Sequence, residues 1–368
     1  MKTLLRLLLK SQHQRNRSGP AQTEKGMTLV ELLVGAIMAF LIITPMLAFV
    51  VDMLNTDRRE QVKSNTEQDI QAAVDFIAQD LSQAIYIYDN NPDTTSTATT
   101  TPTGIPALVA GNFIPENPNE TPILVFWKRQ ILQNSLPLAA GVQPNTCPST
   151  TPSTGPTCND TYVLALVAYY EVREANSNSI WCQPSGAPCP TRIVRYQIQD
   201  GLRDPNSVDP DPSKRYFTGV TTAQKRSPGF FAGSTTEAGF DISRPTQKVT
   251  TGAANFSRDP QVLVNYIDHP SPVQKPIDPE ECKKALGNPT DKTGVTPTPL
   301  PETTLKRANP DNTNSFYTCV DTARNVARVT IRGNSLRRIQ TDADYDDKKA
   351  AYFPTASVQV QGLGARGE

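Results

Sequence analysis

Histidine is almost absent from this chain, and so are the motifs that usually accompany catalysis. Only two histidines occur among 368 residues, and His269 is the only one after residue 26. The sequence has no GxSxG, HExxH or Walker motif, and no GxGxxG motif that opens a helix, so the usual nucleophilic, metal-dependent and phosphate-binding sites are excluded. No nucleophile motif surrounds His269 in "YIDHPSPV". The sequence therefore predicts a protein that is not an enzyme.

The chain also lacks a net charge and is poor in aromatic residues. Its 36 basic and 36 acidic residues cancel, but residues 1–26 hold six basic side chains against one acidic side chain. The remainder is mildly acidic and has no basic patch, which argues against nucleic acid as a partner. Aromatic residues make up 7%, whereas there are 32 prolines and 20 glycines. This composition favours one core of moderate size with long irregular insertions.

The cysteines lack the CxxC spacing of zinc sites, and only one histidine accompanies them. All six fall in the part of the chain that we expect to be exported, where an even number predicts disulfides. Many connectivities are possible, but loop-closure entropy favours near neighbours. Buried or reactive thiols are the alternatives. The expected pairs are Cys147–Cys158, Cys182–Cys189 and, by elimination, Cys282–Cys319.

One long apolar run is present, Met27–Val51, and Glu31 interrupts it near its start. A secretory signal peptide would have a shorter apolar core and a small-residue cleavage site, and the run has neither. A plain anchor explains the length, since such a run can span about 30 Å of hydrocarbon, but it leaves the costly carboxylate unexplained. The basic segment before the run is expected to stay in the cytoplasm, which places the chain after Val51 across the membrane.

The stretch "KGMTLVELLVG" resembles the processing site of type IV pilins and pseudopilins. The resemblance implies that a prepilin peptidase removes residues 1–26 by cutting after Gly26 and that the new amine of Met27 is methylated. It also implies that Glu31 pairs with the N-terminal ammonium of a neighbouring subunit during filament assembly. Such pairing would recover much of the cost of a carboxylate in hydrocarbon.

The helix is predicted to continue well beyond the membrane. No glycine or proline occurs in residues 52–89, and apolar residues recur at steps of three or four from Ile70 to Tyr88. We therefore expect a membrane or filament-core helix over 27–51 and an amphipathic continuation over 52–89. The segment "FIAQDLSQA" resembles the helix of J-type minor pseudopilins and W-type minor pilins, although an ordinary amphipathic helix gives the same pattern. The matching residues are Phe76, Ile77, Asp80, Leu81 and Ala84.

Residues 90–368 are expected to form a β-rich head. β-Branched and aromatic residues predict strands, and the resemblance implies an α+β, type IV pilin-like fold in which one long helix packs on an antiparallel sheet. The Thr/Pro-rich tracts 90–106, 143–158 and 288–304 are expected to be surface insertions, two of them held by disulfides. A contact surface, a glycan-binding surface or O-glycosylation are the alternatives for these tracts. The predicted strands cover residues 122–128, 161–173, 191–199, 261–267, 327–333 and 356–362.

One acidic segment, "QTDADYDDKKA", has the composition of a metal site. Its carboxylates suit a hard cation such as Ca²⁺, but it lacks the central glycine and bidentate glutamate of an EF-hand loop. A solvated acidic loop is the preferred interpretation, so no cofactor is expected and Ca²⁺ is the alternative. The candidate ligands are Asp342, Asp344, Asp346 and Asp347.

The resemblance implies a minor pseudopilin, a structural subunit of a filament of the type II secretion or type IV pilus kind. Its partners would be other pilins or pseudopilins, the prepilin peptidase and the inner-membrane assembly platform. It would cross the inner membrane once, with its N-terminus in the cytoplasm and its head in the periplasm, and would then join a periplasmic or cell-surface filament.

A finer resemblance concerns the exported cargo. The long polar leader and the Thr/Pro/Asn-rich head resemble cyanobacterial members of the family, in particular the pseudopilins of hormogonium polysaccharide secretion. That resemblance implies polysaccharide export for gliding motility. A pilus-tip adhesin and a membrane-anchored periplasmic enzyme without a recognisable motif are the competing hypotheses.

Overall fold

The computed structural model divides the chain into two compact units, Met1–Arg58 and Arg59–Glu368. Helix α2, Leu29–Ser82, contributes a segment to each unit. Gly26 and Met27 lie outside the described residues. The described residues are 28–91, 104–110, 114–116, 118–138, 142–147, 158–183, 186, 189–211, 214–227, 230, 260–267, 278–291, 297–309, 314–341 and 343–364.

The described part of the first unit consists of Thr28 and the first segment of α2. Helix α2 contains one proline, Pro45, which has no N–H to donate to the carbonyl of Leu41. Immediately before it, the hydroxyl of Thr44 donates to the carbonyl oxygen of Phe40 at 2.8 Å. A helix tolerates proline in an apolar segment when neighbouring Ser or Thr side chains adjust the hydrogen bonding around it.

The second unit contains two large antiparallel sheets and a small one. The five-stranded sheet has the order β1-β2-β3-β4-β5, and the four-stranded sheet has the order β11-β10-β9-β8. The strands of the first are β1 (Ala84–Ile87), β2 (Glu120–Pro137), β3 (Cys158–Arg173), β4 (Thr191–Gln199) and β5 (Gln261–Ile267). Those of the second are β8 (Lys306–Ala308), β9 (Phe316–Asp321), β10 (Val326–Arg332) and β11 (Thr355–Gln361), while β6 (Thr290–Asp291) pairs with β7 (Thr298–Pro299).

Short helices occupy several connections between the strands. The α-helices are α3 (Ile105–Ala110), α4 (Glu281–Ala285) and α5 (Glu302–Leu305). The 3-10 helices are η1 (Pro144–Thr146), η2 (Ile180–Cys182), η4 (Thr222–Gln224), η5 (Ser335–Arg338) and η6 (Asp347–Tyr352).

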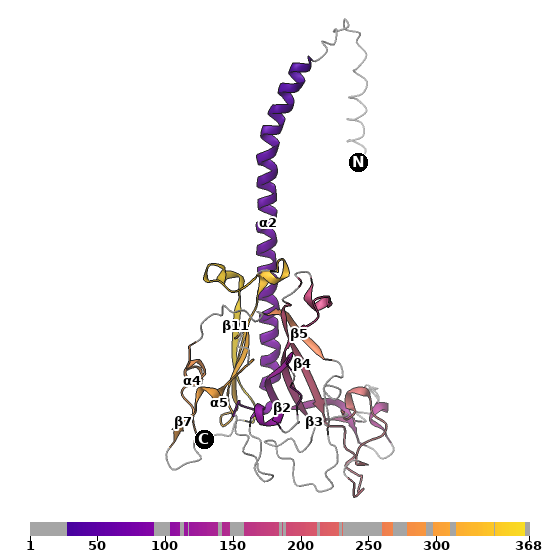
Figure 1. Ribbon diagram of the computed structural model, residues 1–368. Helices are drawn as coiled ribbons and strands as arrows, with labels where there is room; N and C mark the ends of the chain where they lie inside the picture. Colours follow the sequence, from indigo (N-terminus) through magenta and orange to yellow (C-terminus); the bar gives the residue numbers. More distant parts are fainter. Residues whose placement is uncertain are drawn as a thin grey trace, which may run out of the picture. The chain divides into compact units, whose positions relative to one another are not determined.

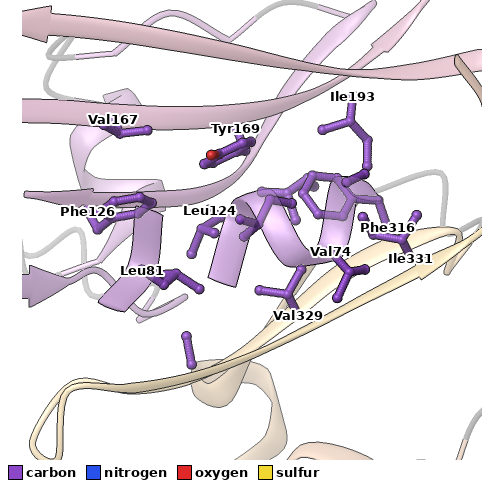
Figure 2. Close-up of a cluster of buried hydrophobic side chains, with 14 of the residues drawn as sticks. Val74, Leu81, Leu124, Phe126, Val167, Tyr169, Ile193, Phe316, Val329 and Ile331 are labelled. Atoms are coloured by element: carbon purple, nitrogen blue, oxygen red, sulfur yellow. The ribbon is translucent and has the colours of Figure 1, made fainter. Parts of the chain in front are cut away.

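The main core of the second unit forms where α2 packs against both large sheets. In Figure 1, strands β4 and β5 appear on one side of α2 and β11 on the other. Figure 2 shows Val74 and Leu81 of the helix between strands of the two sheets, with Phe126 on one side and Val329 on the other. Burying each such side chain contributes about 1.5–3 kcal/mol. The helix residues in this core are Ile70, Ala73, Val74, Ile77 and Leu81.

The other face of the five-stranded sheet is also buried. There Trp127 of β2 and Tyr170 of β3 pack in one cluster with Leu108 of α3 and with Phe230. The indole N–H of Trp127 donates to the hydroxyl of Tyr88 at 2.9 Å, which satisfies a buried donor. A sheet covered on both faces needs apolar residues at consecutive positions, which explains the run "ILVFW" in β2.

The predicted α+β class with antiparallel strands is confirmed, and β4 and β5 have the predicted bounds. The predicted end of the long helix is wrong: the helix ends at Ser82, and Ala84–Ile87 form β1. Ile85, Tyr86 and Ile87 are β-branched or aromatic, and pairing with β2 prevails over the helical periodicity. The expectation of one sheet is also wrong. All six residues of β9, "FYTCVD", are buried, so the strand shows no alternation in its sequence.

The second unit contains the three disulfides that loop closure favours. They join Cys147 to Cys158, Cys182 to Cys189 and Cys282 to Cys319, with Cα–Cα distances of 5.8, 4.7 and 5.2 Å. The third links α4 to β9, and its two cysteines are fully buried. Each disulfide is expected to stabilise the unit by about 2–4 kcal/mol, chiefly by restricting the unfolded chain.

Gly333, at the end of β10, allows the four-stranded sheet to approach α2 closely. A Cβ atom at this position would collide with Cδ1 of Ile70 and lie 2.8 Å from Cγ2 of Thr66. Replacing Gly333 with alanine should therefore lower the free energy of unfolding by about 1–3 kcal/mol, the usual cost of overpacking. Thermal unfolding of the full chain in detergent measures the effect. The control is Gly35→Ala, because a Cβ there meets nothing within 4 Å; an equal loss of stability in both variants would contradict the prediction.

Candidate functional site: the apolar helix and its carboxylate

The first turn of α2 is closed by two side chains that bond to each other's backbone. The amide of Glu31 donates to Oγ1 of Thr28 at 3.3 Å, and the amide of Thr28 donates to Oε2 of Glu31 at 3.4 Å. The Thr28 hydroxyl also donates to Oε2 of Glu31, at 3.3 Å. This reciprocal arrangement is a capping box, in which Thr-x-x-Glu satisfies helix N–H groups that have no intrahelical partner. A carboxylate at this end is also stabilised by the helix dipole.

Beyond this turn, the first unit presents large apolar side chains to its surroundings. Leu29 is 84% exposed, Phe40 75% and Phe49 68%, values expected for polar surface residues. A continuous apolar surface of this extent is not stable in water and marks a membrane or protein contact. Within the described residues, α2 is the one helix long and apolar enough to cross a membrane.

Of the residues predicted to act in processing and assembly, Glu31 lies within the described part of the chain. Glu31 lies on the third residue of α2, where Thr28 supplies its hydrogen bonds among the described residues. Gly26 and Met27, the predicted processing site, lie outside the described part of the chain. Sequence reasoning singled out the charge of Glu31 but missed its cap, although the signal, Thr followed three residues later by Glu, is visible in the sequence.

A second carboxylate on the same helix, Asp80, holds the helix to the five-stranded sheet. Its Oδ1 accepts a hydrogen bond from Nζ of Lys128 in β2 at 2.7 Å. Its Oδ2 accepts one from Nε of Arg195 in β4 at 2.6 Å and one from the hydroxyl of Tyr169 in β3 at 2.7 Å. Three neighbouring strands thus donate to one buried carboxylate. Opposite charges and satisfied oxygens make burial of this group tolerable.

The two cations compensate the cost of burying Asp80. Burial alone would raise the pKa of Asp80, but Arg195 and Lys128 outweigh it, and the pKa lies below its ordinary value of 3.8. Arg195 is itself held from two sides. One of its terminal amino groups donates to Oε1 of Gln197 at 2.6 Å, and its guanidinium carbon lies over the ring of Phe76, 5.8 Å from the ring centroid. Phe76 and Asp80, two residues of the segment "FIAQDLSQA", therefore contact the same arginine.

The pKa of Asp89, just after β1, is shifted in the opposite direction from that of Asp80. Its carboxylate is buried close to Asp321, and burial raises the pKa of Asp89 to about 6. The backbone amide of Asn91 donates to its Oδ1 at 3.0 Å. Protonation removes this buried charge. The contribution of Asp89 to the stability of the fold therefore increases as the pH falls from about 6 to 3.8, the ordinary value of its pKa.

The acidic segment that could have held Ca²⁺ uses its carboxylates locally. Oδ1 of Asp346 accepts from the amide of Lys348 at 2.9 Å, and Oδ1 of Asp347 accepts from the hydroxyl of Tyr345 at 3.1 Å. Asp344 lies near the guanidinium of Arg337. Asp342 and His269 lie outside the described residues. Among the residues that are described, no group of three or more His, Cys, Asp or Glu side chains could hold a metal ion.

The partners of Asp80 were not predicted, although the sequence carries part of the signal. Asp80 interrupts a stripe of apolar residues, and Lys128 and Arg195 each lie in a largely apolar strand, "PILVFWK" and "TRIVRYQIQ". A charge within an apolar stripe needs a buried countercharge. Only the sheet order and register bring these two strands to the helix.

Comparison with known proteins found no match among family models, curated proteins or solved structures.

Replacing Asp80 with asparagine should lower the free energy of unfolding by about 3–5 kcal/mol, because it leaves Lys128 and Arg195 buried without a countercharge. Since the pKa of Asp80 is lowered in the fold, its contribution is present above about pH 4 and is lost as the pH falls below that value. The stability of the Asp80→Asn variant should not show this decrease. Urea unfolding between pH 3 and pH 7 measures both effects, and the titration of Asp89 cancels in the difference between the two proteins.

The matched control for this comparison is Asp75→Asn on the exposed face of α2, where Oδ1 accepts only from the side chain of Gln71 among the described residues. It should change stability by no more than about 0.5 kcal/mol. If Asp80→Asn were equally mild, the carboxylate would not be the group that holds the helix to the sheet.

Proposed function

We propose that this chain is a minor pseudopilin, a membrane-anchored structural subunit that assembles with other pilin-like subunits into a filament used for export. The observation that carries the proposal is the combination on one helix. Residues 29–54 expose apolar side chains, Glu31 lies at the third helical position, and the same helix ends inside a β-rich head. A simple anchor would need neither the carboxylate nor a helix built into the core of the head.

The capping box suggests how Glu31 serves two stages. Before assembly, the carboxylate bonds Thr28 and lies at the positive end of the helix dipole, which lowers the cost of keeping it at the edge of the membrane. Removal of residues 1–26 would create an amine on Met27, one residue before the cap. The ammonium of an adjacent subunit could then pair with Glu31, and unpaired subunits would be disfavoured in hydrocarbon.

The direction of insertion follows from charge. The basic residues before the apolar run would stay in the cytoplasm, and the head would lie on the opposite side of the membrane. An oxidising compartment there suits the three disulfides of the head. The cargo that we propose is a polysaccharide exported for gliding motility. The basis is the resemblance of the leader and the Thr/Pro-rich tracts to those of cyanobacterial pseudopilins.

Mass spectrometry of the chain purified from membranes tests the proposal. The expected product lacks residues 1–26 and begins with an N-methylated Met27. Changing Gly26 to a bulky residue should leave the chain unprocessed, because the peptidase would cut after this glycine. A mature chain that retains residues 1–26, or one that begins after Val51, would sink the proposal.

The charge of Glu31 can be separated from its cap by two variants. Glu31→Gln keeps an acceptor for the Thr28 amide but removes the charge, whereas Thr28→Ala removes the hydroxyl and keeps the charge. Glu31→Gln should reduce incorporation into isolated filaments at least tenfold while membrane insertion stays normal. Thr28→Ala should have a smaller effect. The measurement is the ratio of filament-bound to membrane-bound chain, and equal defects in both variants would assign Glu31 a capping role only.

A further inference from the structure

Lys306, the first residue of β8, lies beside the buried disulfide that links α4 to β9. It pairs with Cys319 of β9, and Cys319 and Cys282 belong to an apolar cluster that includes Leu305 and Tyr317. The ammonium nitrogen Nζ of Lys306 lies over the ring of Tyr317, 4.8 Å from the ring centroid. The lysine side chain therefore runs along β9 towards the beginning of that strand.

The end of this side chain reaches the carboxamide of Asn314, which precedes β9. Nζ of Lys306 donates to Oδ1 of Asn314 at 3.3 Å. Asn314 is only 7% exposed, and its φ of 49° lies in the left-handed region that asparagine tolerates better than most residues. Among the described residues, Lys306 is the one hydrogen-bond partner of the Asn314 side chain. A primary amine and a carboxamide are thus held in contact at a site that is largely shielded from water.

Two carboxylates lie near the same ammonium group, but neither accepts its hydrogen bond. Glu281 and Glu302 both act electrostatically on Lys306, and within the described residues no ion pair joins either of them to it. Both oxygens of Glu302 accept from backbone amides at the start of α4, at 2.8 and 3.0 Å. Oε1 of Glu281 accepts from the hydroxyl of Tyr317, the residue whose ring lies below the ammonium. Glu281 is therefore the carboxylate available to exchange a proton with Lys306.

The surroundings of Lys306 favour its neutral form. Burial lowers the pKa of Lys306 below its ordinary value of 10.5, although Glu281 and Glu302 act to raise it. A lower pKa increases the fraction of neutral amine, which is the nucleophilic form. The hydrogen bond keeps the amine beside the carbonyl group of Asn314, so a small rotation of the carboxamide brings Nζ to its carbon atom. Holding two groups together in this way removes the entropic cost of bringing them into contact.

We propose that Lys306 and Asn314 become joined by an isopeptide bond between their side chains. The neutral amine attacks Cγ of Asn314 and forms the new N–C bond, and Glu281 accepts the proton that the amine loses, directly or through one water molecule. Glu281 then returns the proton to Nδ2, the C–N bond of the carboxamide breaks, and ammonia leaves. The product is a secondary amide, and no oxidant, metal or other reactant is consumed. The reaction takes place once in each chain.

The bond would fix a short strand at the edge of its sheet. Strand β8 has three residues and only one neighbouring strand, β9, so few backbone hydrogen bonds hold it. The disulfide Cys282–Cys319 already joins α4 to β9, and the isopeptide bond would add β8 to the same covalent framework. All of these groups belong to the second unit, so the reaction is independent of the filament role proposed above.

Mass spectrometry of the purified full chain, after reduction and digestion with trypsin, tests for the bond. Trypsin does not cleave after an acylated lysine, so the expected product joins residues 293–307 to residues 308–324. Its mass should be lower than the sum of these two peptides by one molecule of ammonia. Separate peptides 293–306 and 308–324, each at its full mass, would overturn the proposal.

Two variants distinguish the bond from a loss of ammonia within Asn314 alone, which occurs when an asparagine cyclises onto the following backbone amide. Lys306→Arg keeps a cation over Tyr317 but has no nucleophilic amine. Asn314→Gly removes the carboxamide and suits the positive φ. Both variants should yield separate peptides of full mass. A Lys306→Arg chain that still loses ammonia at Asn314 would identify cyclisation and would contradict the cross-link.

The role of Glu281 has its own test. Glu281→Gln keeps an acceptor for the hydroxyl of Tyr317 but cannot take up a proton from the amine. At a fixed time after synthesis, the cross-linked fraction should fall about tenfold or more, because general acid–base catalysis is lost. The matched control is Glu280→Gln, since the side chain of Glu280 is 56% exposed and bonds Lys283; this variant should cross-link like wild type. Equal cross-linking in the two variants would refute Glu281 as the proton carrier.

Discussion

The position of α2 in the second unit depends on the neutralisation of one buried carboxylate, that of Asp80. Apolar contacts hold α2 between the two sheets, but they are not directional and tolerate small rotations of the helix. Asp80 accepts from Lys128, Tyr169 and Arg195, and these donors come from three neighbouring strands. The directional bonds therefore select one rotation of the helix relative to β2, β3 and β4. The connection from Ser82 to Ala84 spans a single residue, Gln83, so the same rotation also determines where β1 enters the sheet.

This arrangement explains why one helix can serve two environments. Its second half is fixed to the sheets by an ion cluster and an apolar core, whereas its first half exposes apolar side chains that only hydrocarbon or another apolar helix can cover. Two of the carboxylates on this helix, Asp80 and Glu31, both need hydrogen-bond or ionic partners, but they lie in different surroundings. Asp80 has its countercharges within the chain, while Glu31 has only the hydrogen bonds of a cap among the described residues. A carboxylate without an internal cation is the one that can respond to an external cation.

The sequence was sufficient for features that depend on local pattern. The membrane-length run, the strands β4 and β5 and the three disulfide pairs follow from hydropathy, β-propensity and loop closure, all of which are visible in a short window. The end of α2 was not predictable in this way, because "AIYIY" continues the apolar stripe and becomes a strand only through pairing with β2. The second sheet was missed for a similar reason, since β9 is buried at every position. The partners of Asp80 lie 48, 89 and 115 residues away in sequence, so only the strand order identifies them.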